Sequence, residues 1–273
     1  MINAGFTCPN RDGKVGTGGC SFCRTDSFSP SYCIGSIKDQ ITAGKKFFAG
    51  KYPEMKYLAY FQSYTNTYGE ESEIFQLYQE ALDCDDVIGM VVGTRPDCLS
   101  ETIIEHFKAL KAQGYIVQIE IGVESFYDRT LTRVNRGHTV ADSVDAIKRC
   151  AAAGLEVCIH IIFGLPGETR QDILGYADFI NALPVTSVKI HQLQILRGTK
   201  ISEEWANQPE DFLNPTVDEY VSLVVSFIRL LHNNIKIERF ASSAPKELLL
   251  SPSWGIKPQE LQRKVESVIK SKE

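Results

Sequence analysis

Apolar runs that alternate with helical patterns constrain the fold of this chain more than any other feature. Five runs rich in β-branched and aromatic residues are expected to form strands: Tyr57–Phe61, Val87–Val92, Ile116–Val123, Val157–Phe163 and Val188–Leu196. Helical patterns lie between them, at Lys38–Phe48, Glu73–Leu82, Glu101–Ala112, Val140–Ala153 and Asp172–Leu183. Near-continuous apolar strands that alternate with helices are typical of parallel βαβ units. The sequence therefore predicts an α/β fold with a parallel sheet.

Local signals mark where several of these helices begin and end. Thr139, Thr169 and Thr216 each stand three positions before an acidic residue, which is the capping-box pattern of a helix N-terminus. Gly114 and Gly154 follow helical patterns and fit helix ends, because glycine accepts the left-handed conformation found there.

The number of strands limits the architecture. Five strands and the short segment before Cys8 make about six βα units, too few for a complete eight-stranded barrel. We therefore expect a partial barrel, open on one side, with a further strand possible at Ile235–Phe240. Residues 1–200 would form the barrel core, and residues 201–273 a helical extension packed on it. Because Met1–Thr7 is short for a first strand, either the fold begins abruptly or the natural chain is longer at its N-terminus.

Composition excludes several classes of protein. The formal net charge of −5 argues against a nucleic-acid-binding protein that is basic over its whole surface, although it does not exclude a local basic patch. No run of about 18 apolar residues predicts a membrane span, and no secretory signal is visible. Eight cysteines in such a chain favour metal or redox chemistry over a disulfide scaffold, so we expect a cytoplasmic protein.

The segment from Cys8 to Cys23 carries the clearest chemical signal. Its spacing is C-x11-C-x2-C, and thiolates are the ligands that iron–sulfur clusters need. Several glycines allow the intervening loop to fold tightly, and Phe22 would shield a cluster from water. Three thiolates leave one iron of a four-iron cluster without a protein ligand, and an open metal position is what a cosubstrate needs.

Other interpretations of the cysteines stay open. Cys8, Cys20 and Cys23 could hold zinc together with a histidine, or they could be core residues. Cys33 is a candidate fourth ligand, although no paired spacing supports it. Buried structural thiols are the default for the remaining four cysteines: Cys84, Cys98, Cys150 and Cys158.

At this point the chain resembles a known family. The run G-F-T-C-P-N-R-D-G followed by G-G-C-S-F-C is similar to that of the YhcC-like radical S-adenosylmethionine (SAM) proteins, relatives of the radical SAM domain of the Elongator catalytic subunit. Further motifs follow in the same order: Ala59–Tyr68, Val92–Cys98, Ile119–Ser125, Asn135–Thr139, His160–Thr169 and Lys189–Thr199. The resemblance covers Gly5 to about Ala244.

The resemblance implies a partial (β/α)6 TIM-like barrel with SAM bound across the carboxyl ends of the strands. It also implies that Cys8, Cys20 and Cys23 hold a [4Fe–4S] cluster whose open iron chelates the amino and carboxylate groups of SAM. One electron from the cluster would then break a carbon–sulfur bond and yield a 5′-deoxyadenosyl radical.

Candidate SAM contacts follow from the same motifs, each with an alternative. Gln62, Ser63 and Thr65 stand where relatives carry a Gly-Gly-Glu-like turn that binds the SAM amino group, but they fit a polar loop equally well. Glu124 lies near the place of the SAM ribose, and we expect it to share one face of its strand with Glu120. These assignments predict a ligand site at the strand ends.

The later motifs supply further candidates. Arg136 matches an arginine that contacts the SAM carboxylate, unless it is a surface residue. His160 is either a ribose contact or a core histidine, and the backbone of Gly164 and Leu165 is expected to pack along the adenine. For His138 the alternatives are a substrate contact and a helix cap.

Two other motifs leave their roles open. Arg95 either binds an anion or pairs with Asp97 or Glu120. His191 and Gln194 either face the substrate or pack in the core.

The predicted activity is reductive cleavage of SAM on an unidentified substrate, for which an RNA base in tRNA is one candidate. An electron donor such as a ferredoxin or flavodoxin is implied, and a membrane is not. One alternative is a non-enzymatic iron–sulfur or zinc protein. Another is an RNA-binding module with a vestigial cluster, which predicts that Lys45, Lys46, Lys51 and Lys56 gather on one face, although an ordinary solvated helix face would explain them too.

Overall fold

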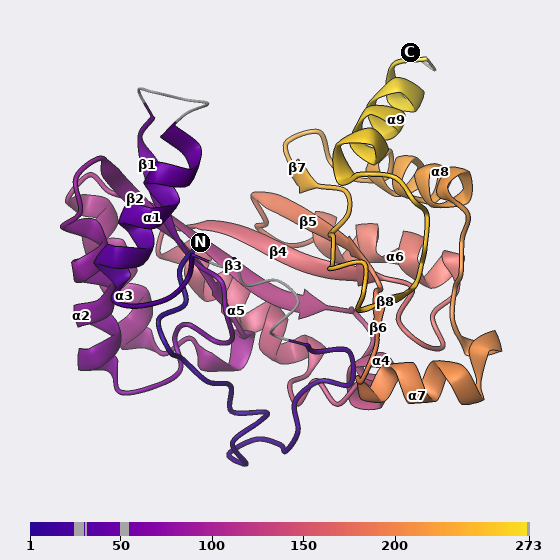
Figure 1. Cartoon of the computed structure of the whole chain (residues 1–273), viewed down its shortest axis with the longest axis horizontal. Coiled ribbons are helices and arrows are strands. Elements are labelled where there is room, and N and C mark those ends of the chain that lie inside the picture. Colours follow the sequence, from indigo (N-terminus) through magenta and orange to yellow (C-terminus); the bar gives the residue numbers. More distant parts are fainter. Residues whose placement is uncertain (25–29, 31, 50–54, 272–273) are drawn as a thin grey trace.

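The computed structural model describes residues 1–24, 30, 32–49 and 55–271 of the chain. Six parallel strands form one curled sheet in the order β1–β2–β3–β4–β5–β7 (Figure 1). Their bounds are β1 Tyr57–Phe61, β2 Val87–Thr94, β3 Ile116–Glu124, β4 Glu156–Phe163, β5 Ser187–Gln192 and β7 Lys236–Arg239. The predicted α/β partial barrel is confirmed.

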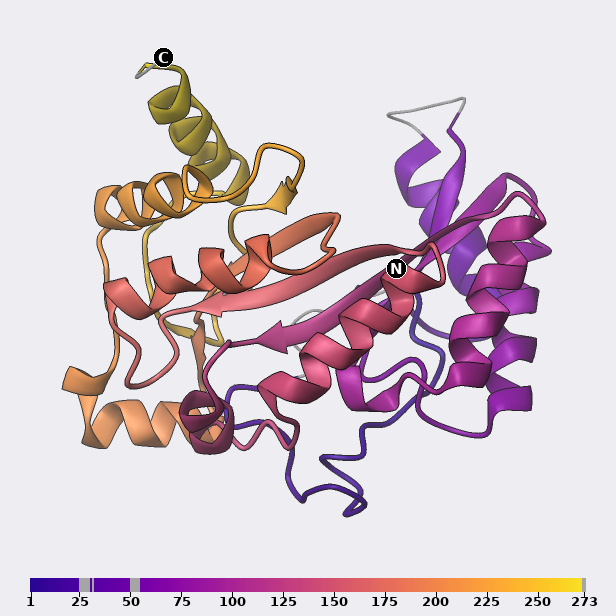
Figure 2. The ribbon, with the colours of Figure 1, turned by 180° about the vertical axis from the view of Figure 1, so that it is seen from behind.

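Helices follow the strands as the alternation predicts. They are α1 Ile37–Ala49, α2 Glu71–Leu82, α3 Glu101–Ala112, α4 Asp128–Arg133, α5 Val140–Ala152, α6 Arg170–Asn181, α7 Lys200–Asn207, α8 Val217–Ile228 and α9 Pro258–Lys270, with short 3-10 turns η2 Pro96–Cys98 and η3 Pro209–Asp211. Figure 2 shows α5 and α6 lying across one face of the sheet. Figure 1 shows the N-terminal segment passing the opposite face. The helices leave that second face free to receive polar groups and loops.

The predicted helix signals are confirmed. Thr139, Thr169 and Thr216 each form a complete capping box, in which the threonine hydroxyl accepts from a backbone N–H three residues on. Gly114 and Gly154 have φ values of +98° and +75°, the left-handed conformation that ends a helix. These local rules place the ends of α3, α5, α6 and α8.

The sixth strand differs from the one expected. The segment before Cys8 contributes only an isolated bridge, in which Ile2 pairs with Phe61 at the outer side of β1. The possible strand at Ile235–Phe240 is instead a full member of the sheet, β7, and pairs with β5. The barrel therefore takes its sixth strand from the C-terminal part of the chain.

The predicted strand Val188–Leu196 is interrupted, so its bounds were wrong. It leaves the sheet after Gln192 and resumes as β6 Ile195–Leu196, which pairs with antiparallel β8 Leu249–Ser251. At this point the amide of Gln192 bonds the backbone of Ser242 in both directions, at 2.8 and 2.9 Å.

Residues 201–273 include most of α7, together with α8, α9, β7 and β8. The division of the chain at residue 200 stays a prediction. In the described residues no helix combines the length and the apolar run needed to cross a membrane.

Candidate active site

A cavity of about 720 Å³ opens at the carboxyl ends of the strands. All three cysteines of the C-x11-C-x2-C motif border it, together with polar residues of the sheet and its loops: Gln62, Thr65, Glu120, Glu124, Arg136, His160, His191 and Arg239. This edge of a parallel sheet is where α/β proteins place their ligands, and the volume is within the range of ligand pockets. The predicted cluster residues and most of the predicted SAM contacts therefore meet in one space.

The cysteine loop is held in place by backbone hydrogen bonds. Cys23 N–H donates to the Cys20 carbonyl at 3.0 Å, which closes the C-x2-C turn. Ser21 N–H donates to the Val134 carbonyl at 2.9 Å and ties this turn to the segment after α4. Gly16 permits a close approach, because a Cβ atom there would lie 2.3 Å from Oδ1 of Asn10.

Nitrogen donors point at the sulfur atoms. Arg136 Nη1 lies 3.5 Å from Cys20 Sγ, Asn10 Nδ2 lies 3.7 Å from the same sulfur, and Arg11 Nη1 lies 4.0 Å from Cys23 Sγ. Donors and positive charge stabilise thiolate, the form that ligates iron. The surroundings of Cys20 and Cys23 therefore favour metal ligation over a core role.

The closeness of the thiols also affects their pKa values. Burial, and then the neighbouring Cys20, raise the pKa of Cys23 to about 11, against the charges of Arg11 and Arg136. Thiolates packed together repel, and a bound cation removes this cost by replacing the protons. The donor set thus fits a cationic metal centre.

The spacing of the sulfurs argues against a single zinc ion. A tetrahedral zinc with bonds of about 2.3 Å would hold its sulfur ligands only about 3.8 Å apart. Among the described residues the only three metal-ligating groups that all lie within 4.8 Å of one another are Glu120, Cys158 and His160. The three motif cysteines do not form such a compact group.

In the group of Glu120, Cys158 and His160, the carboxylate already has hydrogen-bond and ion-pair partners within the protein. The Glu120 carboxylate accepts from the Tyr60 hydroxyl at 2.6 Å, lies 2.8 Å from His160 Nε2 and binds the Lys189 ammonium. Burial alone would raise the pKa of Glu120, but His160 and Lys189 lower it to about 2. The group is a buried ion-pair network rather than an open metal site.

Arg136 is buried, so its interpretation as a surface arginine was wrong. Besides Cys20, its guanidinium donates to the Gly122 carbonyl at 2.7 Å and to His138 Nε2 at 2.9 Å, and it lies 3.3 Å from the Glu124 carboxylate. Burial and the two nearby arginines lower the pKa of His138 to about 2. His138 is therefore a neutral acceptor inside the fold rather than a helix cap.

The other predicted SAM contacts differ in whether they border the large cavity. Gln62 and Thr65 border the cavity, whereas Ser63 is buried beside them and does not. Glu120 and Glu124 both border it, as expected from their shared face, although Glu124 has a φ of +66° next to a register shift. His160 borders the cavity but is held by Glu120.

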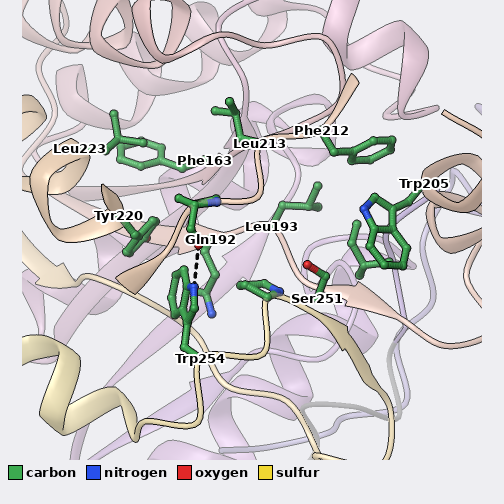
Figure 3. Close-up of a pocket in the computed structure, with 14 residues that line it drawn as sticks. Phe163, Gln192, Leu193, Trp205, Phe212, Leu213, Tyr220, Leu223, Ser251 and Trp254 are labelled. Atoms are coloured by element: carbon green, nitrogen blue, oxygen red, sulfur yellow. Dashed lines mark hydrogen bonds between the residues drawn. The ribbon is translucent and has the colours of Figure 1, made fainter. Parts of the chain in front are cut away.

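Gly164 and Leu165 lie away from the large cavity. Gly164 borders a neighbouring cavity of about 20 Å³, enough for about one water, which Trp205, Tyr220 and Trp254 help to line (Figure 3). Leu165 is completely buried in a small apolar cluster. Their proposed contact with adenine stays a prediction.

Contacts of the described residues bear on two of the open alternatives. Arg95 forms a paired hydrogen bond with Asp97, at 2.8 Å for each nitrogen, so it is a structural ion pair. Lys45 and Lys56 both pair with Asp86, at 3.6 and 2.8 Å, which weakens the idea of a free basic face. Lys51 of the same predicted face lies outside the described residues.

Sequence reasoning missed several residues of the site. Asn10 stands in the recognised C-P-N-R run, and its side chain, which also bonds the Asn135 carbonyl, was not singled out. Lys189 stands two positions before His191 on β5, so both side chains share one face of the strand, and this spacing could have predicted that Lys189 faces the barrel interior. Arg239 gave no such signal, because its position depends on an irregular strand pairing.

A parallel half-barrel with three free cysteines around a ligand-sized cavity defines the class: an α/β half-barrel protein with a thiol-lined site. Comparison with protein families makes this specific. Residues 7–180 match the Radical SAM superfamily, and residues 185–271 match the Radical_SAM C-terminal domain. The chain belongs to the radical SAM superfamily, whose members are enzymes that bind a [4Fe–4S] cluster and SAM.

Individual relatives agree. The chain is 34% identical to protein YhcC of Escherichia coli K12 over 254 residues, covering 93% of this chain and 81% of that protein. It is 32% identical to protein YtqA of Bacillus subtilis over 263 residues, covering 95% and 80%. A weaker match, 26% over 182 residues, covers 64% of this chain and 32% of a tRNA uridine(34) acetyltransferase of Methanocaldococcus infernus.

A solved structure shows the same fold. The archaeal Elp3 of Methanocaldococcus infernus, with an N-terminal deletion, superposes with a TM-score of 0.59 at 22% identity. The match covers 74% of this chain and 46% of the archaeal one, so this chain corresponds to under half of that structure.

Proposed function

We propose that the chain holds a [4Fe–4S] cluster through Cys8, Cys20 and Cys23 and cleaves SAM reductively. When bound, such a cluster supplies the electron that breaks a carbon–sulfur bond of SAM to give a 5′-deoxyadenosyl radical. The observation that carries this proposal is the meeting of the three thiols at one cavity, with nitrogen donors aimed at two of the sulfurs. Membership of the superfamily supports the same chemistry.

Arg136 has one donor left for a ligand. A guanidinium carries five N–H groups, and Gly122, His138, Glu124 and Cys20 account for four of them. The remaining N–H lies on Nη1, beside the Cys20 sulfur. This N–H would donate to the carboxylate of SAM, and the Glu124 carboxylate would accept from the hydroxyl groups of the ribose.

The other SAM contacts are proposed on position. Gln62 and Thr65 offer oxygen acceptors to the SAM amino group from the loop after β1, with Ser63 supporting that loop. His160 would meet the ribose from β4, and Gly164 and Leu165 would shape the adenine side from the loop after it. The Glu120 network fixes the ring of His160 through the 2.8 Å contact at Nε2.

For the substrate we propose an RNA base in tRNA. Two relatives whose names refer to tRNA uridine match part of this chain, although the matches span only 32% and 22% of their own length. Tyr64 borders the cavity, and an aromatic ring offers a stacking face to a splayed base. A ferredoxin or flavodoxin in the cytoplasm would supply the electron.

Anaerobic reconstitution with iron and sulfide tests this function. The full chain, once reduced and mixed with SAM, is expected to release 5′-deoxyadenosine, measured by liquid chromatography. Protein that carries about four irons per chain and releases no product above a protein-free control would overturn the proposal.

A further inference from the structure

The side chains of two consecutive charged residues at the end of β7, Glu238 and Arg239, both bond residues of β5. In a regular strand neighbouring side chains point to opposite faces. Here Val188 pairs with Ile237 and Lys189 with Arg239, so Glu238 is an extra residue in the ladder. Glu238 binds Ser187 and Gln118 at 2.5 Å, and Arg239 Nη2 lies 2.5 Å from His191 Nε2. The irregularity therefore adds a cation to the cavity, and such bulges often re-aim a side chain beside an active site.

Arg239 has no counterion in the described part of the chain. No carboxylate there lies within 4.0 Å of its guanidinium, and its Nε is buried without a hydrogen-bond partner. Glu238 is already engaged by Lys189 at 3.5 Å, and Glu120 by Lys189 and His160. A half-buried guanidinium without an anion is costly, and a ligand that supplies one removes the cost.

The partner that Arg239 does have is neutral. A guanidinium can only donate, so His191 Nε2 must accept, which leaves the proton on Nδ1. The imidazole therefore orients Arg239 without neutralising it. Ser242 and Ser243, which follow β7, also border the cavity and offer hydroxyl groups near this end.

Arg239 is well placed for a ligand other than SAM. It ends β7, the edge strand opposite β1, and the proposed SAM amino-group contacts follow β1. The sulfur atoms are contacted by Asn10, Arg11 and Arg136 instead. Both ends border the same 720 Å³ cavity, so groups bound at each would face one another.

We infer that Arg239, oriented by His191, forms a substrate subsite for an anionic group, either a carboxylate or a phosphate. The planar fork of arginine suits both groups, which it binds with two parallel hydrogen bonds. This inference rests on the proposed function for the meaning of the site, because the substrate is the molecule that the radical would attack. The anion site itself exists in the protein without a cluster, so it can be tested separately.

Chemical protection tests the site in the apo chain of 273 residues. Phenylglyoxal modifies arginine, and peptide mass spectrometry reports each position. Inorganic phosphate or acetate is expected to slow modification of Arg239 in a saturable way and to leave Arg263, an exposed arginine on α9, unchanged in the same digest. Protection by phosphate alone identifies a phosphorylated substrate, and protection by acetate alone a carboxylate. Equal rates with and without both anions would overturn the subsite.

A pair of variants gives a second measurement. Phosphate is expected to raise the Tm of the wild type and of R263Q by a few degrees more than that of R239Q, because only a specific site adds to the general effect of the salt. The loss in R239Q corresponds to an affinity about tenfold weaker or more, as for one charge-assisted hydrogen bond. Equal shifts in all three proteins would contradict the inference. Should R239Q not fold, the protection experiment still decides.

The same experiment on the holoprotein distinguishes a substrate subsite from a SAM contact. With the cluster loaded, SAM is expected to leave Arg239 open to protection by phosphate or acetate. If SAM alone protects Arg239 as fully as these anions, the residue serves SAM and the substrate subsite is overturned. A wild type that shows anion protection but forms no 5′-deoxyadenosine would instead reject the proposed function and keep the anion site.

Discussion

Two groups of residues at the cavity, a sulfur rim and a barrel floor, satisfy their polar atoms to different degrees. The sulfur rim consists of Cys8, Cys20 and Cys23 with Asn10, Arg11 and Arg136. Its donor–sulfur contacts are long, 3.5–4.0 Å, and the buried Oδ1 of Asn10 has no hydrogen-bond partner among the described residues.

The barrel floor consists of Tyr60, Glu120, His160 and Lys189, whose polar groups meet at hydrogen-bond distance. The floor is thus complete in the protein alone, whereas the rim needs a bound group. Rim variants should change metal loading, and floor variants should change stability.

The largest expected effect is at the rim. Cys23→Ala removes one of three ligands, so iron content and 5′-deoxyadenosine formation should fall by at least about 100-fold, more than loss of a supporting contact costs. Iron assay after anaerobic reconstitution measures this. Cys33→Ala is the matched control, because that thiol contacts the Met1 carbonyl at 3.3 Å, and it should load normally. A Cys23→Ala protein with full iron would show that another group holds the cluster.

The next effect is at the floor. Glu120→Gln leaves the half-buried Lys189 with Glu238 as its only carboxylate partner among the described residues, which should lower the free energy of unfolding by roughly 1–3 kcal/mol. Urea unfolding of the apo chain measures this, with exposed Glu105→Gln as the control. Iron loading of the folded variant should match that of the wild type. An unchanged urea midpoint would mean that the floor contributes no net stability.

Arg136 joins the two regions, so its conservative variant should have an intermediate effect. Arg136→Lys loses the planar fork that spans Cys20, Gly122 and Glu124, and iron affinity should fall by about 10- to 100-fold. Competition with a chelator measures the affinity. Arg129→Lys, at an exposed pair with Asp172, should behave as the wild type. Equal iron affinities for the two variants would show that Arg136 does not support the metal site.

The smallest effect is the pH dependence of His138. Its folded pKa of about 2 is below the ordinary value of 6.5, so the unfolded chain binds the extra proton between these values. Stability should therefore fall as the pH drops below 6.5, by about 1.4 kcal/mol per unit from this residue. Urea unfolding at pH 7.5 and 5.5 should show a smaller difference for His138→Gln than for the wild type. Identical differences would show that His138 is protonated in the fold.

The regular part of the fold was readable from the sequence because local rules govern it. Apolar runs and threonine caps predicted five parallel strands and the starts of α5, α6 and α8. The break after Gln192 was not readable, since no glycine or proline interrupts the run that continues to Leu196. The sixth strand was predicted only as possible, because β7 has just four residues.

The site was readable where its residues sit in a short motif. The cysteine spacing placed three thiols at one cavity, and the alternation of Glu120 with Glu124 placed both carboxylates there. Arg239 was not readable, because its direction follows from the extra residue Glu238 in the β5–β7 pairing. Gly164 and Leu165 lie by a neighbouring cavity and in an apolar cluster, and their assignment to SAM stays a prediction.

The central claim is that three cysteines leave one iron accessible to SAM. The EPR spectrum of the reduced, reconstituted chain, recorded anaerobically with and without SAM, tests this claim directly. The account predicts a new set of g-values that saturates at one SAM per chain. A spectrum that SAM leaves unchanged, from protein with about four irons per chain, would show that a fourth protein ligand closes the site and would contradict the account.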